Sequence, residues 1–150
     1  MNTVRFIGRH EFKRQLHTYD KHCCALISIS DNRHELEEMV ELLKSHNHIA
    51  VSFQDVDHRD GTHISNTQAK KISQFIMDNE GCDFIVHCFA GISRSAAVAK
   101  FINEYYGLED PVLENYKIYN RLVYGRLQST LNCISMEEYY RQLEDERHSL

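Results

Sequence analysis

A cysteine and an arginine stand six residues apart in the segment VHCFAGISRSAA, which covers residues 86–97. Cys88 ends an apolar run that is typical of a buried strand, and the composition after Arg94 is typical of a helix. The segment therefore predicts a strand, a short loop and a helix. The backbone N–H groups of such a loop and the positive end of the helix dipole together favour anion binding. Gly91 permits the positive φ that a tightly curled loop requires.

This loop would suit a phosphate group. Arg94 offers a planar, two-pronged donor that matches two phosphate oxygens. The same positive surroundings should lower the pKa of Cys88, so that the side chain is a thiolate at neutral pH and can attack phosphorus in line. Ser95 can donate a hydrogen bond to that thiolate when it leaves, and His87 can fix the loop through bonds to its backbone. The plainer alternative is a buried cysteine near a surface arginine.

Four apolar runs bounded by polar turns predict strands, and helical patterns lie between them. We therefore expect an α/β fold, with a central, mostly parallel sheet of four to five strands flanked by helices. No repeat, linker or composition break divides the chain, so residues 1–150 are expected to form a single domain. The expected strands cover residues 3–8 (an edge strand), 23–30, 49–53 and 83–88.

Capping residues set the expected helix ends. Asp31 and Ser65 could each cap the start of a helix, and Gly81 could stop the second one. Ser135 and Glu138 form a capping-box pattern at the start of the last helix. The expected helices cover residues 32–45, 66–81, 95–107, 112–120 and 135–147.

The composition excludes several classes of protein. A formal net charge of −5 argues against nucleic acid as a partner. The chain has no membrane-length apolar run and no signal-peptide pattern, so we expect a cytoplasmic protein without a membrane partner. Five cysteines without a CxxC pair do not indicate a disulfide framework or a zinc site, and the ten histidines form no HxxxH or HxH cluster in a helical stretch. No metal is expected.

The stretch HCFAGISRS resembles the signature of cysteine-dependent protein phosphatases: His-Cys, five residues, Arg, then Ser or Thr. The resemblance covers roughly residues 20–143, and the size of the chain resembles the small dual-specificity group of bacteria and phages. It implies that Cys88 forms a phosphocysteine, that Arg94 binds the phosphate and stabilises the transition state, and that Ser95 assists hydrolysis. No cofactor is implied. The amides that would cradle the phosphate oxygens belong to Phe89, Ala90, Gly91, Ile92 and Ser93.

In that family an aspartate on an upstream loop protonates the leaving group. The candidate segment SFQDVDHRDGTH follows the expected strand 49–53, whose carboxyl end would lie at the same sheet edge as Cys88. Asp55 is the preferred candidate, because it is closest to the strand. Asp57 is the alternative, and Asp60 is a third choice. A solvated turn is the ordinary meaning of such a string.

A later segment, IYNRLVYGRL, resembles the part of the family in which an asparagine supports the phosphate loop. Asn120 is the matching residue, although Tyr119 replaces the usual preceding proline. A plain helix cap is an equally good reading of Asn120. Arg121 and Arg126 are expected to be surface charges.

The resulting functional hypothesis is a phosphatase that acts on phosphotyrosine, and also on phosphoserine or phosphothreonine, in a protein or peptide partner. One alternative is a phosphatase for a non-protein phosphate, such as an inositol lipid or an RNA 5′ end. The loop lacks the lysines that lipid-directed members carry, and the net acidity disfavours both of these substrates. A sulfurtransferase or arsenate reductase could use a similar loop. A different class of alternative is a phosphopeptide-binding module with weak catalysis.

Overall fold

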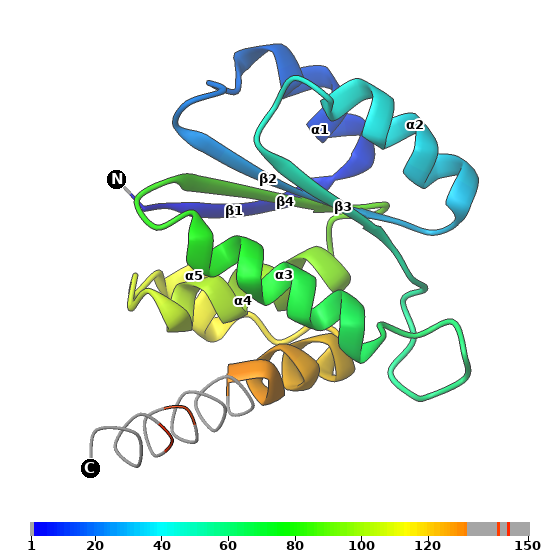
Figure 1. Ribbon diagram of the computed structural model, residues 1–150, viewed down its shortest axis with the longest axis vertical. Coiled ribbons are helices and arrows are strands. Elements are labelled where there is room, and N and C mark those ends of the chain that lie inside the picture. Colours follow the sequence, from blue (N-terminus) through cyan, green and yellow to red (C-terminus); the bar gives the residue numbers. More distant parts are fainter. Residues whose placement is uncertain (1, 132–140, 142–143, 145–150) are drawn as a thin grey trace.

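A parallel sheet of four strands forms the centre of the computed structural model, which describes residues 2–131, 141 and 144 (Figure 1). The strand order is β1-β4-β2-β3, and every pairing is parallel. This confirms the expected α/β fold, including the edge strand near the N-terminus. The strands are β1 (Val4–Gly8), β2 (Cys24–Ser30), β3 (His48–Ser52) and β4 (Asp83–Cys88).

Helices cover both faces of the sheet (Figure 1). On one face lie α1 (Arg9–Gln15), the short 3-10 helix Leu16–Thr18 that follows it, and α2 (Arg33–Leu43). On the other face lie α3 (Asn66–Asp78), α4 (Arg94–Tyr105), α5 (Pro111–Asn115) and a further helix over residues 121–131. None of the described helices is long and apolar enough to cross a membrane.

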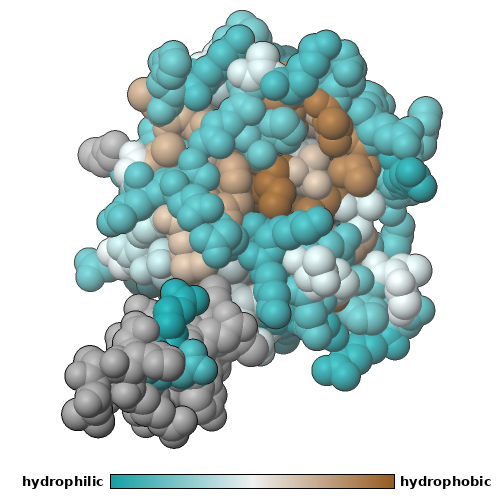
Figure 2. Space-filling model, viewed as in Figure 1, coloured by the Kyte–Doolittle hydropathy of each residue, from teal (hydrophilic) through white to brown (hydrophobic). Residues whose placement is uncertain are grey.

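The two central strands are buried on both faces, and their side chains alternate between two hydrophobic cores. In β4, Val86 and Cys88 belong to the larger core beneath α3 and α4, whereas Ile85 belongs to the smaller core beneath α1 and α2. Figure 2 shows a mostly hydrophilic surface, on which hydrophobic residues gather where β3 crosses below α2. The strand alternation therefore places Cys88 and its neighbour His87 on opposite faces of the sheet.

The helix starts agree with the sequence at one position and differ at another. Ser65 caps α3 and forms a capping box with Gln68, as expected. The cap of α2 is Asn32, whose side chain accepts from the backbone N–H of Glu35, so the assignment of the cap to Asp31 was wrong. Asp31 is one residue too early to cap this helix, and its carboxylate pairs with Arg94 instead.

The observed ends of the helices differ more from the expected positions than their starts do. The expected stop at Gly81 was wrong, because α3 ends at Asp78 and Asn79 is its C-cap. The expected helix 112–120 was wrong in its second half: α5 ends at Asn115, residues 116–120 are not helical, and a new helix begins at residue 121. Asn120 caps this new helix by accepting from the N–H of Val123. The helix expected over 135–147, with its Ser135–Glu138 capping box, lies largely outside the described residues.

The end of β1 holds the loop that follows β4. The backbone N–H of Arg9 donates to the carbonyl oxygen of Phe89 over 3.1 Å. Gly91 has a φ of +73°, and a Cβ there would lie 2.2 Å from the backbone nitrogen of Gly8. Both the conformation and the close approach therefore require glycine at this position.

We expect Gly91→Ala to lower the free energy of unfolding by about 3 kcal/mol or more, because it adds a backbone clash to the cost of a positive φ. Gly107→Ala is the matched control. Gly107 also has a positive φ (+60°), but no atom lies within 4 Å of an added Cβ. The free energy of unfolding of Gly107→Ala should therefore fall by only about 1–2 kcal/mol. Urea denaturation measures the free energy of unfolding of both variants. Equal losses would contradict the close approach of Gly91 to Gly8.

Candidate active site

The loop of residues 89–93 curls around the sulfur of Cys88 at the carboxyl end of the central strand β4. The N–H of Gly91 donates to Sγ over 3.3 Å, and the hydroxyl oxygen of Ser95 lies 3.2 Å from Sγ. Cys88 itself is only 1% exposed. The structure thus brings together the cysteine, the loop and the first turn of α4, as the sequence suggested.

The surroundings of Cys88 favour a thiolate. Burial by itself raises the pKa of the Cys88 thiol. Hydrogen bonds from the side chain and backbone of Ser95 and from the backbone of Gly91, together with the charge of Arg94, outweigh this effect and leave the pKa below 9.0. A thiolate is the nucleophilic form of cysteine, so the loop both holds and activates this side chain.

Arg94 is the first residue of α4 and is 4% exposed. Its Nη1 pairs with Asp31 Oδ1 at 2.6 Å and donates to the carbonyl oxygen of Phe53 at 2.8 Å. Its buried Nε has no hydrogen-bond partner in the part of the chain that the structure describes. A buried donor without a partner is costly, so the Nε edge of the guanidinium is prepared for an acceptor such as an anion.

Asp31 is a functional residue that sequence reasoning missed. It follows β2 directly, so it lies at the same edge of the sheet as Cys88, the last residue of β4. Its carboxylate and the backbone of Phe53 fix the guanidinium of Arg94 from two neighbouring strands. The available signal was an acidic residue at the end of a buried strand, but that position also suits a helix cap.

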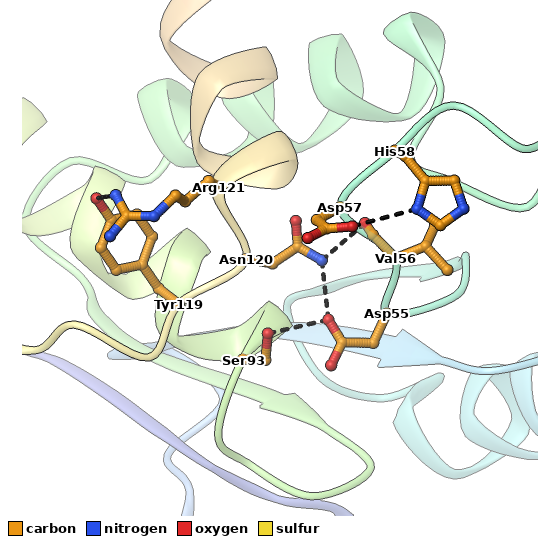
Figure 3. Close-up of a pocket in the computed structure, with 8 residues that line it drawn as sticks. All are labelled: Asp55, Val56, Asp57, His58, Ser93, Tyr119, Asn120 and Arg121. Atoms are coloured by element: carbon orange, nitrogen blue, oxygen red, sulfur yellow. Dashed lines mark hydrogen bonds and ion pairs between the residues drawn. The ribbon is translucent and has the colours of Figure 1, made fainter.

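Asp55 lies at the rim of the loop (Figure 3). Its Oδ1 accepts from the hydroxyl of Ser93 at 2.9 Å and from Nδ2 of Asn120 at 2.8 Å. Asn120 is 5% exposed, and it also donates to the carbonyl oxygen of Val56. Its own backbone N–H donates to the carbonyl oxygen of Ser93 over 3.1 Å. Asn120 therefore joins Asp55 to the loop and caps a helix at the same time, so the two readings of this residue do not compete.

The other two aspartates of this segment are not tied to the loop in the same way. The side chain of Asp57 is 84% exposed and interacts with His58 (Figure 3). Asp60 accepts from the hydroxyl and backbone N–H of Thr62, and these bonds lower its pKa. The geometry thus favours Asp55 over Asp57 and Asp60 as a group that could act on a bound phosphate ester.

His87 supports the site from the other face of the sheet. Its ring lies 4.2 Å from that of Phe12, and Nε2 lies 2.6 Å from Ser28 Oγ. Its contact with the loop backbone is longer, 3.4 Å from Nδ1 to the carbonyl oxygen of Cys88. Burial is the main reason that its pKa falls to about 4, so the imidazole is neutral at pH 7. These contacts make His87 a buried, neutral group that packs beneath the loop.

A pocket of about 410 Å³ adjoins the loop (Figure 3). Cys88 does not line it, because the sulfur is buried under the curl, but Ser93 and Asp55 do. On the loop itself, the side chains of Phe89 and Ile92 are 60% and 48% exposed. The remaining lining residues are Val56, Asp57, His58, Tyr119, Asn120 and Arg121.

Among the described residues, no group of three or more His, Cys, Asp or Glu side chains is arranged to hold a metal ion. No protein-family profile matches the chain, and no curated protein matches its sequence. One solved structure, a mutant form of Tk-PTP, is similar over 95% of this chain and 92% of its own, with 18% sequence identity and a TM-score of 0.46. At that level of similarity, function must be argued from the site of this chain itself.

The lowered pKa of Cys88 can be tested by alkylation. We expect the rate of iodoacetamide modification at Cys88 to fall on acidification with a midpoint below pH 9.0, because only the thiolate reacts. Ser95→Ala removes a bond that lowers the pKa and should move the midpoint upward. Ser45→Ala, at an exposed position, is the control. Mass spectrometry of the Cys88 peptide separates this reaction from that of the exposed Cys23, and an unchanged midpoint in Ser95→Ala would contradict the assignment.

Proposed function

We propose that the chain is a phosphatase of the cysteine-dependent type, which hydrolyses phosphotyrosine through a phosphocysteine intermediate. The observation that carries the proposal is the buried Arg94, whose Nε has no partner, beside a cysteine whose pKa is lowered. A phosphate seated on the loop would supply the acceptor that Nε lacks. The same position presents phosphorus to the sulfur of Cys88.

The reaction then has two steps. In the first, Cys88 Sγ forms a bond to phosphorus, the ester P–O bond breaks, and Asp55 gives its proton to the leaving oxygen. In the second, Asp55 takes a proton from water, which attacks phosphorus, and the S–P bond breaks. Ser95 donates a hydrogen bond to the departing thiolate. Arg94 and the amides of the loop stabilise the charge on the phosphoryl oxygens in both steps.

Phosphotyrosine is the preferred substrate in this proposal. Phe89 and Ile92 expose apolar side chains on the loop, where the ring of a tyrosine can pack. Phosphoserine and phosphothreonine reach the sulfur with a shorter side chain and gain less from these contacts, so we expect lower turnover for them. Membership of the small dual-specificity group, which the HCFAGISRS motif and the chain length resemble, is part of the same proposal. A cytoplasmic location and a single domain remain part of the hypothesis.

Hydrolysis of an aryl phosphate in the presence of EDTA tests the proposal. We expect turnover to survive chelation and vanadate to inhibit competitively, because the loop binds a phosphate mimic. Cys88→Ser should abolish turnover and still bind inorganic phosphate, since Arg94 and the loop amides remain. Cys82→Ser, at a half-buried cysteine outside the site, is the matched control. Loss of activity with EDTA, or turnover by Cys88→Ser, would sink the cysteine mechanism. A strict preference for inositol phosphates over phosphotyrosine peptides would refute the substrate assignment.

The role of Asp55 predicts a dependence on the leaving group. Asp55→Asn cannot donate a proton, so we expect it to lose the basic limb of the pH–rate profile and about 10²–10⁴-fold in rate for poor leaving groups. The loss should shrink towards nothing for an activated aryl phosphate. Asp57→Asn should keep the wild-type dependence. If Asp57→Asn, and not Asp55→Asn, changed the dependence, the acid would be assigned two residues further on.

A further inference from the structure

A second pocket, of about 330 Å³, lies beside the first and contains three arginines. Arg59 comes from the loop that carries Asp55, and Arg121 and Arg126 come from the helix over residues 121–131. Asn66, Leu122, Gly125 and Ser129 complete the lining. The sequence suggested that Arg121 and Arg126 are separate surface charges, whereas the fold brings them to one pocket together with Arg59.

Arg121 lines both pockets, so the two are contiguous. Its position is fixed by Tyr119: Nη1 donates to the tyrosine hydroxyl over 2.9 Å, and the guanidinium carbon lies 4.8 Å from the ring centre. A substrate that places its phosphate on the Cys88 loop can therefore extend across the first pocket and reach the arginines of the second.

Three guanidinium groups in one pocket bring three positive charges close together. Among the described residues, none of the three forms an ion pair with a carboxylate. Arg126 donates to the neutral side-chain oxygen of Asn66. Like charges repel one another, and an anion placed between them would remove this cost. This local group of three positive charges contrasts with the net charge of −5 of the whole chain.

We propose that this pocket binds a second anionic group of a phosphotyrosine peptide, either an acidic side chain or a second phosphate near the phosphotyrosine in sequence. The proposal rests on the phosphatase function argued above. A peptide fits better than a nucleic acid, because none of the described residues that line the arginine pocket is an aromatic one that could stack on a base. Tyr119, which lines the first pocket, already has Arg121 on its ring.

The test uses phosphotyrosine peptides that are identical except at one flanking position, which is Gln, Glu or phosphoserine. Moving this position along the peptide finds the spacing that reaches the pocket. We expect kcat/KM to be roughly three- to tenfold higher for Glu than for Gln at the best spacing, to be higher again for phosphoserine, and to converge at high salt. Comparison of the Glu and phosphoserine peptides shows which anion the pocket prefers.

Variants assign the preference to the pocket. The ratio of kcat/KM for the Glu and Gln peptides, measured within each variant, should fall towards one in Arg59→Ala and in Arg126→Ala, and below one in Arg126→Glu. Arg126→Lys should keep part of the preference for the Glu peptide, because the positive charge remains. Arg33→Ala, at an arginine with 90% side-chain exposure on α2, is the control and should keep the wild-type ratio. A ratio is insensitive to the amount of folded enzyme, so partial misfolding cannot produce this result.

Three results would overturn the inference. The first is a ratio near one at every spacing, and the second is a wild-type ratio in the double variant Arg59→Ala/Arg126→Ala. The third is a larger effect of these variants on an RNA 5′-triphosphate than on the acidic peptide, which would replace the peptide by a nucleic acid. If no phosphotyrosine peptide is turned over at all, the proposed function itself has failed, which is a distinguishable outcome.

Discussion

The ion pair between Arg94 and Asp31 fixes the position of the candidate site. Arg94 begins α4, Asp31 follows β2, and Phe53, which accepts the second bond, follows β3. One guanidinium therefore joins the ends of three segments that are distant in sequence. Arg94 is buried and the Asp31 side chain is 31% exposed. Desolvation of the guanidinium offsets part of the attraction, so the ion pair adds little net stability but fixes the orientation of the charge. If the arginine turned away from Asp31, its buried guanidinium would lose its ion pair.

Tight backbone contact supplies the second constraint. The curl of the loop after β4 depends on the close approach of Gly91 to Gly8 at the end of β1. The backbone N–H of Arg9 also donates a hydrogen bond to the carbonyl oxygen of Phe89 in this loop. The curl turns the N–H of Gly91 towards the sulfur of Cys88. Four strand ends thus define the site: β1 and β4 shape the loop, and β2 and β3 orient the arginine. A parallel sheet brings all four to the same edge.

Much of this arrangement could be predicted from the sequence, since it depends on local patterns. The strands are short apolar runs between polar turns. The residue types from His87 to Ser95 predict a strand, a loop suited to an anion and a helix. Contacts between distant segments could not be predicted in the same way. Asp31 looked like a helix cap, because nothing local distinguishes a capping aspartate from one that reaches across the sheet to Arg94. The break between α5 and the helix at 121–131 was missed for a similar reason: Asn120 sits within a helical composition, and its side-chain bonds to Asp55 and Val123 become visible only in the fold.

Asn120 connects the last third of the chain to the candidate site. Every group that would bind phosphate or attack it lies before residue 96, and the side chain that holds Asp55 in place comes from the last third of the sequence. The same amide residue caps the helix over residues 121–131, so the stability of that helix and the placement of the acid are linked through one side chain. A change confined to the side chain of Asn120 would leave Cys88, Arg94 and the loop in place but remove the amide that holds Asp55. The surroundings of the Cys88 sulfur and the position of Asp55 thus depend on different parts of the polypeptide.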